Sequence, residues 1–151
     1  MISIRKAIPG DEKTIFSLIN ELALYEKAPE QVTNSAEQLG IDLFKDKICE
    51  AIVASKNDQI IGFALYYISY STWKGRCLYL EDFYVQEVHR KYGAGGMLFN
   101  RVVEIAKDLG VKRMDWQVLE WNQLALDFYK KRNAILDSEW VNGRLYFYSF
   151  R

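Results

Sequence analysis

The sequence is poor in the residues that build metal centres and disulfide frameworks. Its 151 residues include one histidine and two cysteines. The cysteines, Cys49 and Cys77, are isolated from each other and lie in apolar, strand-like segments, which favours buried reduced thiols over a zinc site. We therefore predict a cytoplasmic protein that holds no metal.

The chain also lacks a net charge and any long apolar run. Its 20 lysines and arginines are balanced by 20 aspartates and glutamates, so charge favours neither nucleic acid nor a membrane surface as a partner. No run approaches transmembrane length, and residues 1–6 contain no apolar stretch of the signal-peptide kind. Half of the residues are hydrophobic and 15% are aromatic, which suits one folded domain over residues 1–151.

Hydrophobic periodicity predicts a mixed α/β fold in which strands and helices share one sheet. We expect Asp11, Ser35 and Asn122 to be helix N-caps, and Asn133 to end the last helix in the left-handed conformation. The predicted strands are residues 2–7, 51–55, 60–70, 78–85 and 112–119, followed by one or two antiparallel strands through residues 144–148.

A glycine-rich turn, residues 90–96, joins the buried strand 78–85 to a helical pattern that ends at Gly110. Such a strand–turn–helix unit presents backbone N–H groups and the positive end of a helix to an anion, so we predict a diphosphate site. The sequence of this turn matches neither the dinucleotide-binding nor the nucleoside-triphosphate-binding fingerprint. From these residues alone, a turn that binds nothing remains an alternative.

Arg90-x-x-Gly93-x-Gly95 resembles the coenzyme A pyrophosphate loop of the GNAT superfamily of N-acetyltransferases. The resemblance covers approximately residues 4–147 and is closest to the spermidine/spermine (diamine) N-acetyltransferase branch. It implies a GNAT fold, with a mostly antiparallel sheet of about seven strands flanked by about four helices. The matching motifs are Glu21-Leu-Ala-x-Tyr25-Glu26, Gly62-Phe-Ala-x-Tyr66-Tyr67, Leu78-Tyr-Leu-Glu-Asp-Phe83, Glu120-Trp-Asn122 and Phe128-Tyr129-Lys-x-Arg132.

The resemblance implies two catalytic residues, Glu81 and Tyr129. An alkylamine with a pKa of about 10.4 is almost fully protonated at neutral pH, so a base that draws off its proton helps. Glu81 lies mid-strand among apolar residues and is expected to be a buried carboxylate that does this through water; alternatively, it only pairs with a cation. Tyr129 would protonate the departing thiolate, although a lone helix tyrosine is more often core packing.

The resemblance also implies acetyl-CoA as the donor and coenzyme A as the product. In the superfamily, backbone groups matching Phe83, Tyr84 and Val85 hold the pantetheine arm. Lys131 and Arg132 are candidates for the 3′-phosphate, with a solvated helix end as the alternative. The remaining implied contacts are Arg90, Lys91, Tyr92, Gly93, Ala94, Gly95 and Gly96 in the turn, and Asn122, Gln123, Leu124 and Ala125 at the next helix.

Carboxylates and aromatic faces attract an alkylammonium. The residues that match the amine site are Tyr25, Glu26, Trp73, Glu81 and Asp82. Glu26 could instead be an exposed charge at a helix end. The polyamine enzymes carry Glu-Glu-Gly-Trp where this chain has Trp140-Val-Asn-Gly143, so short acceptors are expected to be favoured over spermine.

We therefore predict direct acetyl transfer, in a ternary complex, to a primary amine of a diamine, polyamine or lysine-like amino acid. The alternatives are a non-catalytic coenzyme A-binding or regulatory module and an acetyltransferase acting on a protein amine. A homodimer is expected, because the aromatic segment 145–150 would be an adhesive free edge and the related acetyltransferases dimerise.

Overall fold

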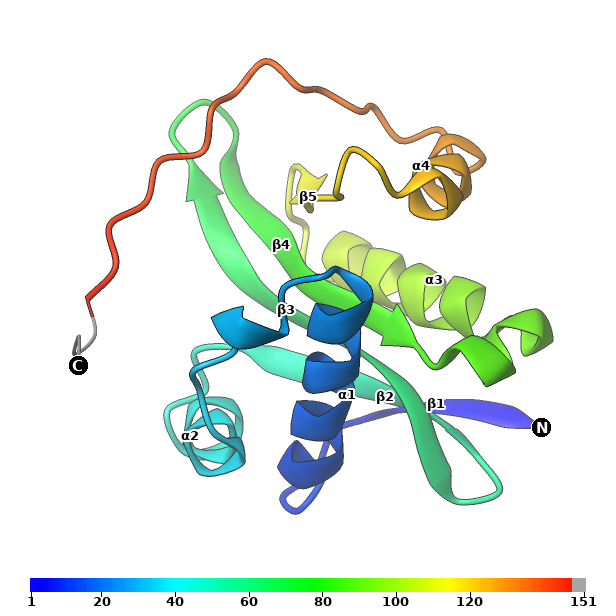
Figure 1. The fold of residues 1–151 in the computed structure, drawn as a ribbon. Coiled ribbons are helices and arrows are strands. Elements are labelled where there is room, and N and C mark those ends of the chain that lie inside the picture. The colour runs from blue at the N-terminus through cyan, green and yellow to red at the C-terminus, as the bar shows by residue number, and fades with distance from the viewer. Residues whose placement is uncertain (148–151) are drawn as a thin grey trace. The chain divides into compact units, whose positions relative to one another are not determined.

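The computed structural model describes residues 1–147, and the chain divides into two compact units. The first unit, Met1–Gln117, holds the sheet and three α-helices (Figure 1). The second unit begins at Val118 and holds helix α4, Gln123–Lys130. Within residues 1–147, no helix is long and apolar enough to cross a membrane.

The sheet of the first unit has five strands in the order β1-β2-β3-β4-β5. Neighbours pair antiparallel from β1 to β4, and β5 runs parallel to β4, so the sheet is mixed as predicted. The strands are β1 Ile2–Lys6, β2 Glu50–Lys56, β3 Gln59–Ser71, β4 Gly75–Val85 and β5 Met114–Asp115.

The described residues thus form five strands where about seven were predicted. The strand predicted over residues 112–119 shrinks to β5, because only Met114 and Asp115 pair with β4. The strands predicted through residues 144–148 are wrong for residues 144–147, which are exposed and form no ladder with another described strand. Residues 148–150 lie outside the described residues, so the homodimer stays a prediction.

Helices cover both faces of the sheet. Val53 and Phe63 pack in one core with Ile15 of α1 (Glu12–Tyr25) and Leu39 of α2 (Ala36–Gly40). The neighbouring residues in these strands point to the opposite face of the sheet and are also buried. Helix α3 (Ala94–Asp108) contributes buried residues of its own to that opposite face. A π-helical turn, Ile41–Lys45, continues α2, and 3₁₀ turns cover Pro29–Gln31 (η1) and Glu87–Tyr92 (η3).

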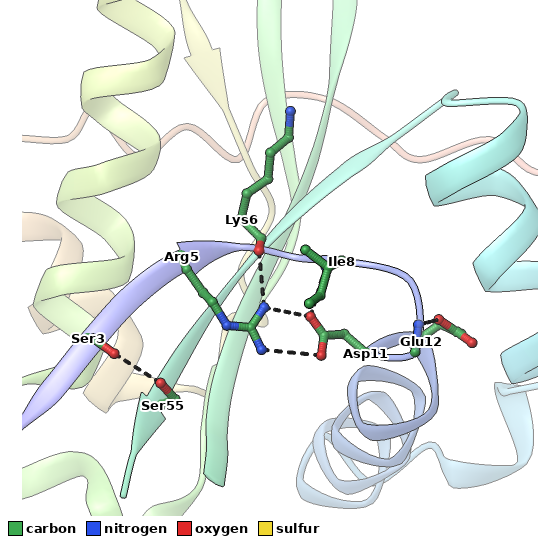
Figure 2. Close-up of polar contacts among 8 residues, drawn as sticks. Ser3, Arg5, Lys6, Ile8, Asp11, Glu12 and Ser55 are labelled. Atoms are coloured by element: carbon green, nitrogen blue, oxygen red, sulfur yellow. Dashed lines mark hydrogen bonds and ion pairs between the residues drawn. The ribbon is translucent and has the colours of Figure 1, made fainter. Parts of the chain in front are cut away.

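All three predicted N-caps occupy the N-cap position of their helices, and two of them cap with their side chains. The Ser35 hydroxyl accepts a hydrogen bond from the Gln38 amide at 3.1 Å, and Asn122 does the same for Ala125 at 3.2 Å. Asp11 is not a side-chain cap. Its carboxylate instead accepts from the Ile8 amide at 2.9 Å and from Arg5 at 2.7 Å, which ties β1 to the start of α1 (Figure 2).

Candidate active site

The central feature of the first unit is a β-bulge in β4. Leu65 of β3 pairs with Asp82, but the next residue, Tyr66, pairs with Leu80, so Glu81 is an extra residue without a cross-strand partner. A bulge re-aims side chains locally. Glu81 is consequently exposed while Asp82 is half-buried, and the prediction of a buried Glu81 is wrong.

Glu26, Glu81 and Asp82, here called the acidic cluster, interact electrostatically. Burial, then the charges of Glu81 and Glu26, raise the pKa of Asp82 to about 7. Glu26 caps the end of α1 and is half-buried, which raises its own pKa. No described residue forms an ion pair with any of the three. Crowded carboxylates without a counter-ion form a site that favours a bound cation.

Two tyrosines that sequence reasoning missed lie beside Glu81. Tyr67 of β3 and Tyr79 of β4 are cross-strand partners whose ring centroids are 5.4 Å apart. Burial and the charge of Glu81 raise the pKa of Tyr79 to about 12, and burial, that charge and a hydrogen bond with Glu81 raise the pKa of Tyr67. Both phenols therefore stay protonated at neutral pH and form an aromatic wall next to the carboxylates.

The raised pKa of Asp82 predicts a pH-dependent cost to stability. Below about pH 4 the carboxyl is protonated in both states; as pH rises to about 7 the unfolded chain releases the proton first, so stability falls. Asp82→Asn removes this cost and should be more stable than wild type by about 1–3 kcal/mol at pH 8, with a smaller gain at pH 5. Urea unfolding at the two pH values measures the difference.

The matched control is Asp108→Asn at the exposed end of α3. That variant should show no pH-dependent gain. An Asp82→Asn protein whose stability follows that of wild type at both pH values would contradict the assigned burial of the Asp82 charge.

The structure separates Trp73 from the acidic cluster. Trp73 lies in the turn between β3 and β4, before the first residue of β4, with 80% of its surface exposed. Glu81 is six residue steps from Gly75 along β4, a distance of about 20 Å. Tyr25, in contrast, ends α1 directly before Glu26, and its ring lies 5.2 Å from the guanidinium of Arg90.

The second half of β4 extends beyond its ladder with β5. The ladder with β5 ends at Tyr79, whereas β4 continues to Val85. The Gln86 amide bonds to Ile61 on β3, so by alternation the backbone groups of Phe83 and Val85 point away from β3. On that side the Val85 N–H can donate to an extended, amide-containing ligand, whereas the Val85 carbonyl accepts from Arg90 at 2.9 Å.

Arg90 braces the turn that follows β4. Its Nε donates to the Val85 carbonyl at 2.9 Å, and its guanidinium lies 5.7 Å from the Tyr84 ring. The Tyr84 hydroxyl donates to Glu21 at 3.1 Å, so the Tyr84 side chain also has a structural role. The predicted phosphate contact of Arg90 would therefore come from a side chain that already holds the backbone in place.

The first turn of α3 has the form of an anion site. Gly93 adopts a left-handed conformation (φ +80°) that L side chains disfavour, and its carbonyl accepts the first helical bond, from Met97. The amides of Ala94, Gly95 and Gly96 thus precede the helical hydrogen-bond ladder. A Cβ on Gly95 would touch only the Phe83 ring, at 3.7 Å, so these residues fit a bound diphosphate.

In the second unit, Tyr129 is buried on α4, and its ring packs edge-on against Phe128 with centroids 5.4 Å apart. The guanidinium of Arg132 lies 3.6 Å from the Phe128 ring and donates to the Phe128 carbonyl at 3.1 Å, so it caps its own helix. Asn133 is left-handed (φ 63°), as predicted.

The other coenzyme candidates of this unit lie around α4. The exposed Lys131 follows the helix directly. At the helix start Gln123 donates to Asp127 at 2.8 Å, Leu124 is exposed, and Ala125 receives the Asn122 cap. Across residues 1–147 no group of three or more histidine, cysteine, aspartate or glutamate side chains could hold a metal ion.

Comparison with known proteins agrees with this geometry. Residues 15–134 match the model of the acetyltransferase (GNAT) family. The chain is 42% identical to a thialysine N-epsilon-acetyltransferase of Bos taurus over 88% of this chain and 84% of the relative. It is 37% identical to a spermidine/spermine N(1)-acetyltransferase-like protein of Homo sapiens over 90% of this chain and 21% of that relative.

Solved structures show the same fold. An integron cassette protein of V. cholerae superposes with a TM-score of 0.77 at 24% identity, covering 96% of this chain and 92% of the other. An aminoglycoside acetyltransferase from a soil metagenome has a TM-score of 0.77 at 18% identity, over 99% and 97% of the two chains. The chain belongs to the acetyltransferase (GNAT) family, in its diamine acetyltransferase-like branch, and is an N-acetyltransferase.

Proposed function

We propose that this enzyme transfers the acetyl group of acetyl-CoA directly, in a ternary complex, to one primary amine of a small acceptor that carries a second cationic amine. The observation that carries the proposal is the acidic cluster, in which Asp82 is half-buried between the charges of Glu81 and Glu26 with no cationic partner among the described residues. A bound ammonium would relieve that crowding.

The names of the relatives support this class of acceptor. Two of them specify one nitrogen of an amino acid, thialysine Nε and L-ornithine N5, and a third specifies N(1) of spermidine or spermine. Each name implies an acceptor with more than one nitrogen, of which a single one reacts. A diamine, a polyamine and a lysine-like amino acid all fit this description.

The donor side is supported by the part of β4 that extends beyond its ladder with β5 and by the first turn of α3. The backbone of Phe83 and Val85 would bind the pantetheine arm, while the amides of Ala94, Gly95 and Gly96 would bind the diphosphate. Enzymes of this family use acetyl-CoA, whose thioester supplies the activated acetyl group. The side chains of this protein then have to orient the amine and move its protons.

Proton movement is divided among three side chains in this proposal. Glu81 is exposed at the bulge, and its charge acts on Tyr67, so it can receive the amine proton through a water molecule. Asp82, with its pKa of about 7, would ionise fully once a cation binds beside it. Tyr129 would donate its phenolic proton to the thiolate, whose own pKa is about 8.5.

The length of the preferred acceptor follows from the number of acidic residues available to bind its ammonium groups. The acidic cluster supplies carboxylates near the reacting amine, whereas Val141 is an exposed apolar residue at the place where polyamine enzymes carry an acidic segment. A distant ammonium would therefore find one anchor fewer. We expect short diamines and lysine-like amino acids to be better acceptors than spermine.

Glu26→Gln tests the acceptor class. The substitution removes a charge that would contact the second ammonium away from the reacting nitrogen, so KM for a short diamine should rise about tenfold with little change in kcat. A neutral monoamine should lose much less. The measurement is kcat/KM from thiol release with a diamine, a lysine analogue, spermidine, spermine and a monoamine.

Glu30→Gln is the matched control, because Glu30 is an exposed acidic residue in the 3₁₀ turn that follows α1. Its kinetics should equal those of wild type. A wild-type preference for monoamines or for amines on proteins, with no response to Glu26→Gln, would refute the proposed acceptor class.

A further inference from the structure

One lysine outside all of the residues considered so far lies against the glycine turn. Lys56 is the last residue of β2, and its Nζ atom lies 3.5 Å from the centroid of the Tyr92 ring. Tyr92 ends η3 and directly precedes Gly93. Figure 1 shows the β2–β3 hairpin and η3 at the same end of the sheet. Lys56 therefore brings a positive charge to the turn from a distant part of the chain.

The position of Lys56 is fixed by its backbone. It pairs with Ile2 on one side and with Gln59 on the other, so both neighbouring strands hold it. The turn that follows has positive φ at both Asn57 (53°) and Asp58 (61°), the geometry of a tight type I′ hairpin. The direction in which the Lys56 side chain leaves the sheet is thus built into the hairpin.

The charge of Lys56 is held in place without being neutralised. An aromatic face attracts an ammonium through its quadrupole but carries no net charge. Lys91 shares the same ring, with its Nζ 5.3 Å from the centroid. Within residues 1–147 neither lysine forms an ion pair. Two ammonium groups therefore flank Tyr92 with their charge available to an anion.

We propose that Lys56 binds a phosphate group of coenzyme A and that Tyr92 positions its ammonium for this contact. The inference rests on the proposed binding of the diphosphate by the amides of Ala94, Gly95 and Gly96. Arg90 uses its Nε to brace the Val85 carbonyl, whereas Lys56 and Lys91 are point charges at the Tyr92 ring, which directly precedes Gly93. Coenzyme A carries phosphate both in its diphosphate and at the 3′ position, and Lys56 can pair with either.

The test is calorimetric binding of coenzyme A and of 3′-dephospho-coenzyme A, which needs no turnover. Lys56→Met should raise Kd for coenzyme A about tenfold, the loss of one charge-assisted contact. Lys56→Arg retains the charge and the ring contact and should bind nearly as well as wild type. A tenfold loss that persists with the dephospho compound assigns the contact to the diphosphate; a loss that disappears assigns it to the 3′-phosphate.

Lys107→Met is the matched control, since Lys107 is exposed in the last turn of α3, at the opposite end of the same helix. It should bind coenzyme A like wild type. An unchanged Kd for Lys56→Met, an equal loss in Lys107→Met, or a Lys56→Arg variant as weak as Lys56→Met would each overturn the role of Lys56. Wild-type protein that binds no coenzyme A would instead refute the proposed function itself.

Discussion

Tyr129→Phe should lower kcat by about 10²–10⁴-fold, the range for a lost general acid. The substitution removes one oxygen from a buried ring that packs against Phe128, and it leaves the shape of α4 unchanged. Without the phenolic proton, the thiolate leaves as an anion and the barrier rises. Because the donor is bound before this step, KM for acetyl-CoA should change little.

Steady-state kinetics on wild type and Tyr129→Phe measure this effect, with circular dichroism to verify folding. Tyr70→Phe is the matched control, because Tyr70 is a largely exposed tyrosine of β3 outside the proposed site. It should turn over like wild type. Near wild-type kcat in Tyr129→Phe at neutral pH would mean that water or another group protonates the thiolate.

Local features of the fold were readable from the sequence because neighbouring residues determine them. Ser35 and Asn122 cap helices because their side chains reach an amide three residues ahead. Asn133 is left-handed at the end of its helix, a conformation that its residue type favours. Asp11 had the same signature as a cap, but Arg5 of β1 competes for its carboxylate, and that partner depends on the fold.

Features that depend on strand register were not readable. The bulge at Glu81 exists only relative to β3, and no pattern within β4 marks it. Once the extra residue is inserted, Glu81 is exposed and the neighbouring carboxyl of Asp82 is half-buried. Pairing of Tyr67 with Tyr79 depends on the same register, so the aromatic wall beside Glu81 could not be predicted either.

Electrostatic contacts between residues far apart in the sequence could be predicted only in part. That Glu26 and Asp82 would gather was inferred from a resemblance, and the structure does place their charges close enough to interact. The contact between Lys56 and Tyr92 had no such signal, because a lysine at a hairpin end is ordinarily solvated. The final strands predicted for residues 144–147 were wrong because aromatic content alone does not provide a neighbouring strand to pair with.

Gly95→Val should abolish binding of acetyl-CoA while the protein stays folded. Gly95 lies in the first turn of α3 with helical backbone angles, so a side chain is tolerated there, and an added Cβ would meet only the Phe83 ring at 3.7 Å. The branched methyl groups of valine would instead fill the space in front of the Ala94, Gly95 and Gly96 amides. A diphosphate could then no longer approach them, and we expect affinity to fall at least about 100-fold.

Gly110→Val provides the matched control, because Gly110 ends the same helix in a left-handed conformation (φ +71°) with no neighbouring atom within 4 Å of an added Cβ. It should lose stability through backbone strain but keep its affinity for acetyl-CoA. Gly95→Val should show the reverse: a nearly unchanged melting temperature and no calorimetric binding. A folded Gly95→Val variant that binds acetyl-CoA with wild-type affinity would show that the diphosphate does not lie at the first turn of α3.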